Sequence, residues 1–173
     1  MRIIAGTRKG ARIFAPKGRD TRPTSDRVRE AAFNLIGSVD EASVLDLFAG
    51  SGAMGLEALS RGAASAVFVE SDREACRTIE RNLEKLRLTG ATVLCRDVLQ
   101  ALASSGQVYD LVLCDPPYEF AEHARLAPYL ARTIAPNGLL VYETAATVEP
   151  AIDGLTVRTS RTYGSARLTL FEP

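Results

Sequence analysis

From Ala42 onward, short apolar runs alternate with longer segments in which apolar residues recur every three or four positions. The runs predict β-strands at 43–48, 65–70, 91–95, 108–114 and 139–143, and the periodic segments predict helices at 52–61, 72–89, 98–104 and 120–135. A turn is expected at Pro136-Asn137-Gly138. The predicted strands are apolar throughout rather than alternating, which is typical of parallel strands covered by helices on both faces.

The two ends of the chain follow other patterns. Residues 155–161 and 166–171 alternate apolar and polar positions, which predicts an antiparallel hairpin at the sheet edge. Residues 2–5 and 11–15 predict a small β-hairpin. A helix is expected from about Thr24 or Ser25 to Ile36, with one apolar face formed by Val28, Ala31, Ala32, Leu35 and Ile36. The fold class is therefore α/β, with a seven-stranded, mostly parallel sheet, a C-terminal antiparallel hairpin and a hairpin-plus-helix extension at residues 1–40.

Composition limits the function classes. The chain has 173 residues, of which 46% are hydrophobic and 24% charged, as in ordinary soluble domains. No apolar run approaches the roughly 20 residues that span a bilayer, and the N-terminus lacks the apolar core of a signal peptide. We therefore expect a cytoplasmic protein without a membrane partner. A monomer is expected as well, although composition does not bear on the oligomeric state.

Charge is distributed unevenly, although the net charge is zero. Residues 1–30 contain nine Lys or Arg and three Asp or Glu. Such a basic segment on an acidic body indicates a polyanionic partner, and a solvated charged tail is the alternative. His123 is the only histidine, and the three cysteines form no C-x-x-C pair, so no metal site is expected. Cys95 and Cys114 end apolar runs and are expected to be buried thiols.

The first candidate site follows the strand at 43–48. Gly50, Gly52 and Gly55 have G-x-G-x-x-G spacing between that strand and a helix. Glycines there allow φ above zero and a close approach of a ligand to the backbone, and the helix directs free N–H groups at that ligand. Glu70 stands twenty residues after Gly50, at the end of the next strand, where an acid can accept hydrogen bonds from ribose hydroxyls. A ligand-free tight turn is the alternative.

The second candidate site is Asp115-Pro116-Pro117-Tyr118, at the end of the fourth strand. Consecutive prolines end a sheet ladder. They leave the Pro116 carbonyl and the Asp115 carboxylate as a pair of acceptors suited to a planar amino group. Tyr118 adds an aromatic face for stacking. Ligands of α/β sheets bind at the carboxyl ends of the strands, so this position favours a binding role over a plain strand terminator.

These motifs together resemble those of class I S-adenosylmethionine-dependent methyltransferases, whose fold is Rossmann-like. Asp46, Gly50 and Gly52 match the first motif of that family, Glu70 the second, Asp97 the third, and Asp115-Pro116-Pro117-Tyr118 the fourth motif of the amino methyltransferases. Residues 2–6, the Arg22-Pro23-Thr24 helix start and Tyr163-Gly164 are similar to the RsmD-type family, which methylates guanine N2 in 16S ribosomal RNA.

The resemblance implies roles for individual residues. It implies that residues 41–173 form the methyltransferase domain and that S-adenosylmethionine is the cofactor, with no metal. The implied cofactor-binding residues are Asp46, Phe48, Ala49, Gly50, Gly52, Glu70, Ser71, Asp97, Val98 and Asp115. The implied catalytic residues are Asp115, Pro116, Pro117 and Tyr118. The partner is ribosomal RNA in the small subunit or an assembly intermediate, and the basic residues expected to hold it are Arg8, Lys9, Arg12, Arg22, Arg27 and Arg29.

Other functions remain open from the sequence. The glycine spacing and Glu70 also fit a nicotinamide-dependent dehydrogenase, which leaves Asp115-Pro116-Pro117-Tyr118 without a role. A non-catalytic RNA-binding assembly factor on the same scaffold is a further alternative. Within the methyltransferases, the amino groups of adenine or cytosine, in RNA or DNA, are alternative acceptors.

Overall fold

The computed structural model describes residues 1–16 and 26–173. Its helices are η1 (Gly6–Arg8, a 3-10 turn), α1 (Asp26–Ile36), α2 (Ala53–Ser60), α3 (Arg73–Leu86), α4 (Val98–Ser104) and α5 (His123–Thr133). Its strands are β1 (Ser43–Leu47), β2 (Ser65–Glu70), β3 (Ala91–Cys95), β4 (Tyr109–Cys114), β5 (Ile134–Ala145), β6 (Thr156–Tyr163) and β7 (Ala166–Glu172). No helix among these residues is long and apolar enough to cross a membrane.

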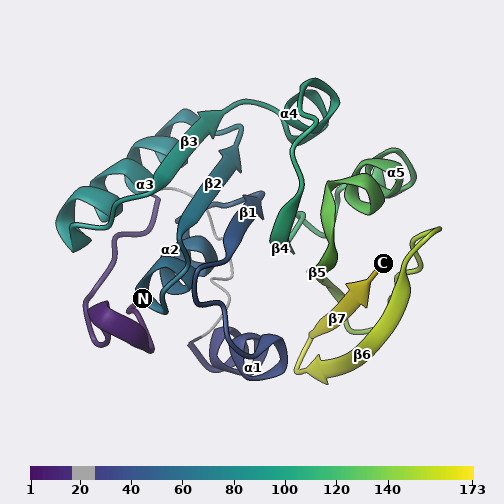
Figure 1. Cartoon of the computed structure of the whole chain (residues 1–173), viewed down its shortest axis with the longest axis horizontal. Helices are drawn as coiled ribbons and strands as arrows, with labels where there is room; N and C mark the ends of the chain where they lie inside the picture. The colour runs from purple at the N-terminus through teal and green to yellow at the C-terminus, as the bar shows by residue number, and fades with distance from the viewer. Residues whose placement is uncertain (17–25) are drawn as a thin grey trace.

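The strands form one seven-stranded sheet in the order β3-β2-β1-β4-β5-β7-β6 (Figure 1). Strands β1 to β5 pair in parallel, whereas β7 is antiparallel to both β5 and β6. This arrangement confirms the predicted α/β class, the mostly parallel sheet and the C-terminal hairpin. The order reverses at β1, since β2 and β4 lie on its two sides, and ligands of such sheets bind at this switch point.

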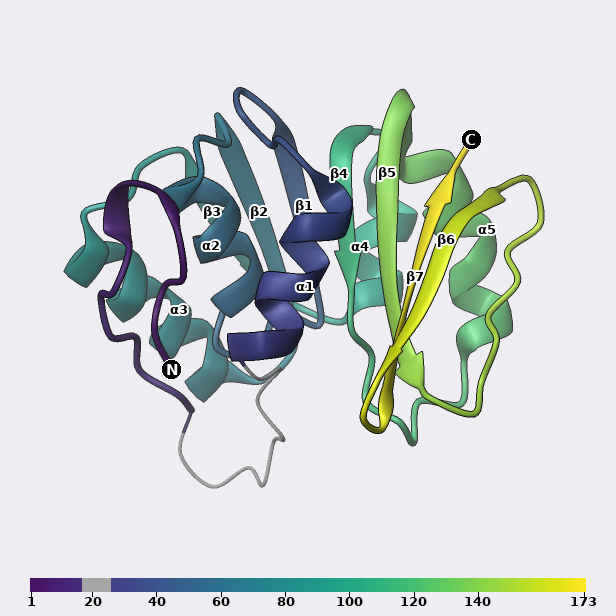
Figure 2. The same ribbon diagram turned by 90° about the horizontal axis from the view of Figure 1, so that it is seen from below.

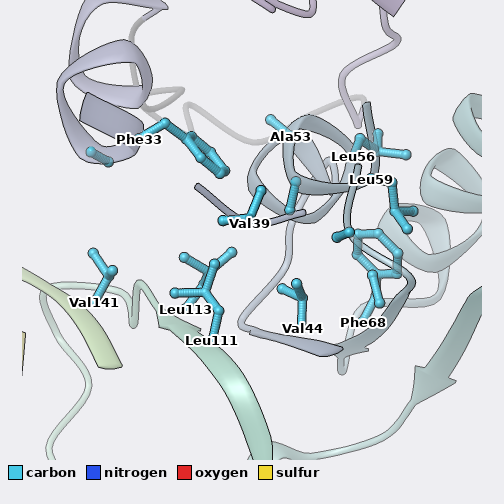
Figure 3. Packing of buried hydrophobic residues seen from close by; sticks show 14 of the residues in the cluster. Phe33, Val39, Val44, Ala53, Leu56, Leu59, Phe68, Leu111, Leu113 and Val141 are labelled. Atoms are coloured by element: carbon cyan, nitrogen blue, oxygen red, sulfur yellow. The ribbon is translucent and has the colours of Figure 1, made fainter. Parts of the chain in front are cut away.

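Helices cover both faces of the sheet (Figures 1 and 2). On one face, α1, α2 and α3 bury Phe33, Leu56, Phe68 and Ile79 in one hydrophobic cluster, part of which is shown in Figure 3. On the other face, α4 and α5 bury Leu102 and Leu130 in a second cluster. Strand residues point alternately to the two clusters, which explains why the parallel strands are apolar at nearly every position.

The first sixteen residues fold back onto α2. The expected hairpin is present as backbone pairing, because Ile3 N–H donates to Ala11 and Ile13 N–H donates to Met1. Only one bridge, Arg2 to Arg12, has strand geometry. Glu57 of α2 is fully buried, and its two carboxylate oxygens accept from the N–H groups of Ile4 and Ala5 at 2.8 and 2.9 Å. This segment is thus anchored by a carboxylate inside the protein.

Two local expectations were wrong. Residues 136–138 form no turn between elements, because β5 runs on from Ile134 with a bulge between the pairs Tyr109–Ile134 and Leu111–Leu139. Cys95 is exposed because β3 is an edge strand. The predicted apolar face of α1 does pack on the core, through Ala32, Val28, Leu35 and Ile36, and the helix also buries Arg29 and Phe33. The predicted helix start at Thr24 or Ser25 lies outside the described residues.

Candidate active site

The register of the sheet aligns β1, β2, β4 and β5 at the edge where the parallel strands end. Leu47 pairs with Val69 on one side and with Cys114 on the other, and Cys114 pairs with Tyr142. The next residues are Phe48 and Asp115, which follow β1 and β4, Glu70, which ends β2, and Glu143, which lies near the end of β5, so three acids and an aromatic residue are neighbours at this edge. A cleft of about 1120 Å³ opens at this edge and is lined by all four.

Residues 50–55, here called the glycine turn, pack closely against neighbouring side chains. Gly52 has φ +77° and precedes α2, and a Cβ there would lie 3.1 Å from Ile79. A Cβ on Gly55 would lie 2.3 Å from the Phe68 ring and 3.0 Å from an Asp46 oxygen. Glycine suits Gly52 because of its left-handed backbone, and it suits Gly55 because a Cβ there would overlap the Phe68 ring. The first turn of α2 therefore lies directly against Asp46.

Asp46 is a buried acid at the floor of the cleft. Its Oδ2 accepts from Gly55 N–H at 2.8 Å, and the residue is 4% exposed. Burial raises the pKa of this carboxyl to about 8; the charges of Asp115 and Glu70 also raise it, and the Gly55 hydrogen bond opposes them. A cation in the cleft would favour the ionised form of Asp46 over the protonated form.

Glu70 and Asp97 each hold backbone N–H groups at the cleft. Glu70 accepts from Gly50 N–H at 2.9 Å and from Asp72 N–H at 2.8 Å, so it ties the glycine turn to the exit of β2. Asp97 caps α4 by accepting from Gln100 N–H at 3.0 Å. Each carboxylate oxygen has two acceptor positions, so both acids retain capacity toward a ligand.

The loop at residues 115–118, here called the acceptor loop, forms the wall of the cleft that faces the glycine turn. Residues 115–118 all line the cleft. Pro116 is buried, whereas Tyr118 is 51% exposed and donates from its hydroxyl to the Ser165 carbonyl at 3.5 Å. Ser165 belongs to the turn between β6 and β7, so the C-terminal hairpin closes this side. The Pro117 carbonyl accepts from Phe120 N–H at 2.8 Å, which folds the loop into a turn after the prolines.

An aromatic row connects the two walls. Phe48 packs edge-on against Phe120 with ring centroids 5.1 Å apart, and Phe120 packs edge-on against His123 at 5.2 Å. His123 Nδ1 is hydrogen-bonded to the Tyr142 hydroxyl. Phe48 has φ 58°, a conformation uncommon for a residue with a Cβ. Strain of this kind persists only where surrounding packing holds it, and it concentrates at functional sites.

The structure brings most of the predicted site residues together. The predicted residues that line the cleft are Asp46, Phe48, Ala49, Gly50, Glu70, Ser71, Asp97, Asp115, Pro116, Pro117, Tyr118 and Arg27. Two predicted residues do not line the cleft. Gly52 is part of the glycine turn, and Val98 is buried in the second hydrophobic cluster. The roles of all these residues toward a cofactor remain predictions. Within residues 1–16 and 26–173, no three His, Cys, Asp or Glu side chains form a group suited to a metal ion.

Two of the basic residues predicted to bind RNA have other partners. The prediction for Arg29 was wrong: its side chain is 0% exposed, and it faces Asp26 at 3.0 Å and Glu57 at 3.7 Å. Arg8 is half-buried and donates to the Leu86 carbonyl at the end of α3. The predicted residue Arg22 lies outside the described residues. Lys9 and Arg12 are exposed and stand away from the cleft lining.

Sequence reasoning missed several residues of the cleft. Glu143, Phe120 and Ser165 line it, together with Met1 and Pro16 from the N-terminal segment. Glu143 carried a usable signal, because it ends an apolar run at the carboxyl end of a strand, as Glu70 does. The others carried none, since their positions depend on how the hairpin and the N-terminal segment pack on the sheet.

Comparison with known proteins agrees with this geometry. The family model described as Conserved hypothetical protein 95 matches residues 1–172. "Putative rRNA methyltransferase YlbH" of Bacillus subtilis is 35% identical over 99% of this chain and 98% of its own. The "Ribosomal RNA small subunit methyltransferase D" of Haemophilus influenzae is 36% identical over 83% of this chain and 78% of its own, and that of Escherichia coli is 43% identical over 68% and 60%.

The similarity extends to three-dimensional structure. The Escherichia coli structure described as "Putative methyltransferase yhhF" superposes with a TM-score of 0.87 at 34% identity, covering 99% of this chain and 96% of that one. A fold match of that quality includes the N-terminal segment and the C-terminal hairpin as well as the sheet. The chain therefore belongs to the family described as Conserved hypothetical protein 95, and the relatives that it matches over most of its length are named as methyltransferases.

Proposed function

We propose that this protein transfers a methyl group from S-adenosylmethionine to the exocyclic N2 of a guanine in small-subunit ribosomal RNA. The observation that carries the proposal is that the glycine turn and the Asp115–Tyr118 loop line one cleft. A methyl donor held by the first and an amino group held by the second can therefore meet. The names of the relatives from Haemophilus influenzae and Escherichia coli support RNA of the small subunit as the substrate class.

The residues of the cleft fit this cofactor. Asp46 is a buried carboxyl whose pKa is raised to about 8 and which faces the cleft; a cationic amino group of the methionine part is the partner that its ionised form lacks. Glu70 and Asp97 keep acceptor capacity for the ribose hydroxyls and the adenine amino group. When bound, the cofactor supplies a methyl group already activated by its sulfonium, so no metal is required.

The acceptor loop positions the nucleophile. The carboxylate of Asp115 and the carbonyl of Pro116 accept hydrogen bonds from the two N–H groups of guanine N2, and the Asp115 carboxylate is the group beside N2 that can take the one proton lost on methylation. These hydrogen bonds concentrate electron density on nitrogen and orient its lone pair toward the methyl group. Tyr118 stacks on the base, which must leave its helical stack to enter the cleft. The hydroxyl bond from Tyr118 to Ser165 holds the ring at the cleft mouth.

RNA outside the cleft contacts the basic face of the N-terminal segment. Lys9 and Arg12 are exposed, and Arg27 is exposed at the cleft itself. Contacts between such side chains and phosphates provide affinity that falls with salt and little choice of sequence. The choice of nucleotide then depends on RNA shape.

The test uses Asp115→Ala with Asp110→Ala as the matched control. Asp110 is exposed at the opposite end of the same strand and bonds to Ser43. Each variant is incubated with tritiated cofactor and subunits lacking the modification, and the product nucleoside is identified. Asp115→Ala should lose transfer while binding the cofactor in calorimetry, and Asp110→Ala should retain both. Transfer by Asp115→Ala, or a wild-type product other than N2-methylguanosine, would refute the proposal.

A further inference from the structure

An exposed aromatic ring with two cations against it lies beside the cleft. Phe14 is 40% exposed. The guanidinium carbon of Arg81 is 4.5 Å from the centroid of its ring, and the ammonium nitrogen of Lys85 is 4.4 Å from it. Single exposed apolar side chains are common on protein surfaces, so the feature that distinguishes Phe14 is the pair of cations packed on its ring.

The two cations belong to a longer basic row on α3. Arg73, Arg77, Arg81 and Lys85 recur every four residues, so they share one face at steps of about 6 Å. All four are exposed. The acids Glu80 and Glu84 stand three residues after Arg77 and Arg81, about 60° around the helix from each, so they border the row on one side. Arg77 faces Glu74 at 3.9 Å, and no carboxylate among the described residues lies within 4 Å of Arg81 or Lys85.

The N-terminal segment adds to the same surface. It runs beside α3 in both views of the molecule (Figures 1 and 2). Residues 1–16 contain four Lys or Arg and no acid. The fully buried amide of Asn82 fixes this segment, since it accepts from Phe14 N–H at 2.7 Å and donates to the Phe14 carbonyl at 3.0 Å. The same amide donates to the Ser51 carbonyl at 3.1 Å, which connects the surface to the glycine turn.

We propose that Phe14, Arg77, Arg81 and Lys85, here called the α3 platform, bind an unpaired segment of the RNA substrate next to the methylated base. The inference depends on the proposed function and names a second place where RNA is held. Clustered cations repel one another in a chain of zero net charge, and a polyanion relieves that repulsion. An aromatic ring among cations is the combination that holds single-stranded nucleic acid: bases stack on the ring or on a guanidinium, and phosphates meet the charges.

The test measures binding of a labelled oligouridine of about 12 nucleotides by fluorescence anisotropy at several salt concentrations. Arg81→Glu combined with Lys85→Glu should raise the dissociation constant at least about tenfold and reduce the salt slope by about 1.4, the value for two lost phosphate contacts on a single strand. Phe14→Leu keeps the apolar packing but removes the stacking face. It should raise the dissociation constant by about fivefold to a hundredfold, with the salt slope unchanged.

The matched control reverses two arginines in the other half of the molecule, Arg125→Glu with Arg158→Glu, which changes the net charge equally. The dissociation constant of this control for the oligonucleotide should lie within about threefold of the wild-type value. Circular dichroism and cofactor calorimetry should show all variants folded and loaded. Oligonucleotide binding by the Arg81/Lys85 variant equal to that of the control would overturn the proposal.

The assay on whole subunits separates the two proposals. Wild type that transfers no methyl group to subunit RNA contradicts the proposed function itself. Normal transfer by wild type, together with an unchanged oligonucleotide affinity and an unchanged KM in the Arg81/Lys85 variant, contradicts only the α3 platform. A raised KM on assembled subunits with unchanged oligonucleotide affinity would assign the surface to a protein partner, and that outcome would also overturn the RNA proposal.

Discussion

Asp46→Asn tests how the cleft recognises a cation. Burial raises the pKa of Asp46 to about 8, so at about pH 7 roughly one protein in ten has this carboxylate ionised. If the ammonium of the cofactor binds the ionised form, its affinity should rise roughly ninefold between about pH 6 and pH 7. An asparagine can still accept from Gly55 N–H, so the turn stays in place. The variant should bind more weakly, and its affinity should change little with pH.

The assay is isothermal titration calorimetry in two buffers of different ionisation enthalpy. Wild type should release close to one proton on binding below about pH 7, and Asp46→Asn should release none. The range stays at or below about pH 7, because an α-amino group with a pKa of about 7.7–8.0 is largely protonated there. Asp110→Asn, at the opposite end of β4, serves as the control and should retain the wild-type pH dependence. A wild-type affinity that does not vary with pH would refute the role assigned to Asp46.

Stability of the cofactor-free protein gives an independent check. The folded protein keeps a proton on Asp46 from about pH 4 to pH 8, whereas the unfolded chain, with an ordinary pKa of 3.8, has lost it. The native state binds more protons in this window, so Asp46 makes the protein less stable as pH rises. The Tm of Asp46→Asn minus the Tm of wild type should therefore increase progressively between about pH 5 and pH 8. An unchanged difference in Tm across this range would show that the raised pKa is wrong.

Three further predictions concern the anchor, the turn and the acceptor loop. Glu57→Gln removes the charge that faces a buried arginine and should lower the free energy of unfolding by about 3–5 kcal/mol in urea; wild-type stability would contradict this. Gly55→Ala places a Cβ 2.3 Å from Phe68 and should destabilise by about 1–3 kcal/mol, whereas Gly106→Ala, which meets no atom within 4 Å, should not. Tyr118→Ala should lower kcat/KM about fivefold to a hundredfold while Tyr118→Phe stays within about threefold; equal losses would exclude stacking.

The sequence alone predicted the sheet and the residues at its carboxyl edge. A buried parallel strand is an apolar run whose end is marked by a polar residue or a proline, and this signal is local. The bounds of β2 and β3 were predicted to the residue and α4 was predicted at about its observed place, and Glu70 and Asp115 were placed at strand ends where the structure has them. The glycine turn was predicted because its spacing reports a backbone conformation that few other residues adopt.

Only the tertiary structure decided where charged side chains and short irregular segments lie. Arg29 reads as an exposed cation on α1, but Glu57, far along the chain, provides a buried counter-charge. The bulge that carries β5 through Pro136 depends on pairing with β4. Phe14 comes to Arg81 and Lys85 because Asn82 holds its backbone. The apolar pattern of a helix or strand depends on residues close together in sequence. The position of a buried charge depends on a partner, often distant in sequence, whose interaction offsets the free-energy cost of removing water from that charge.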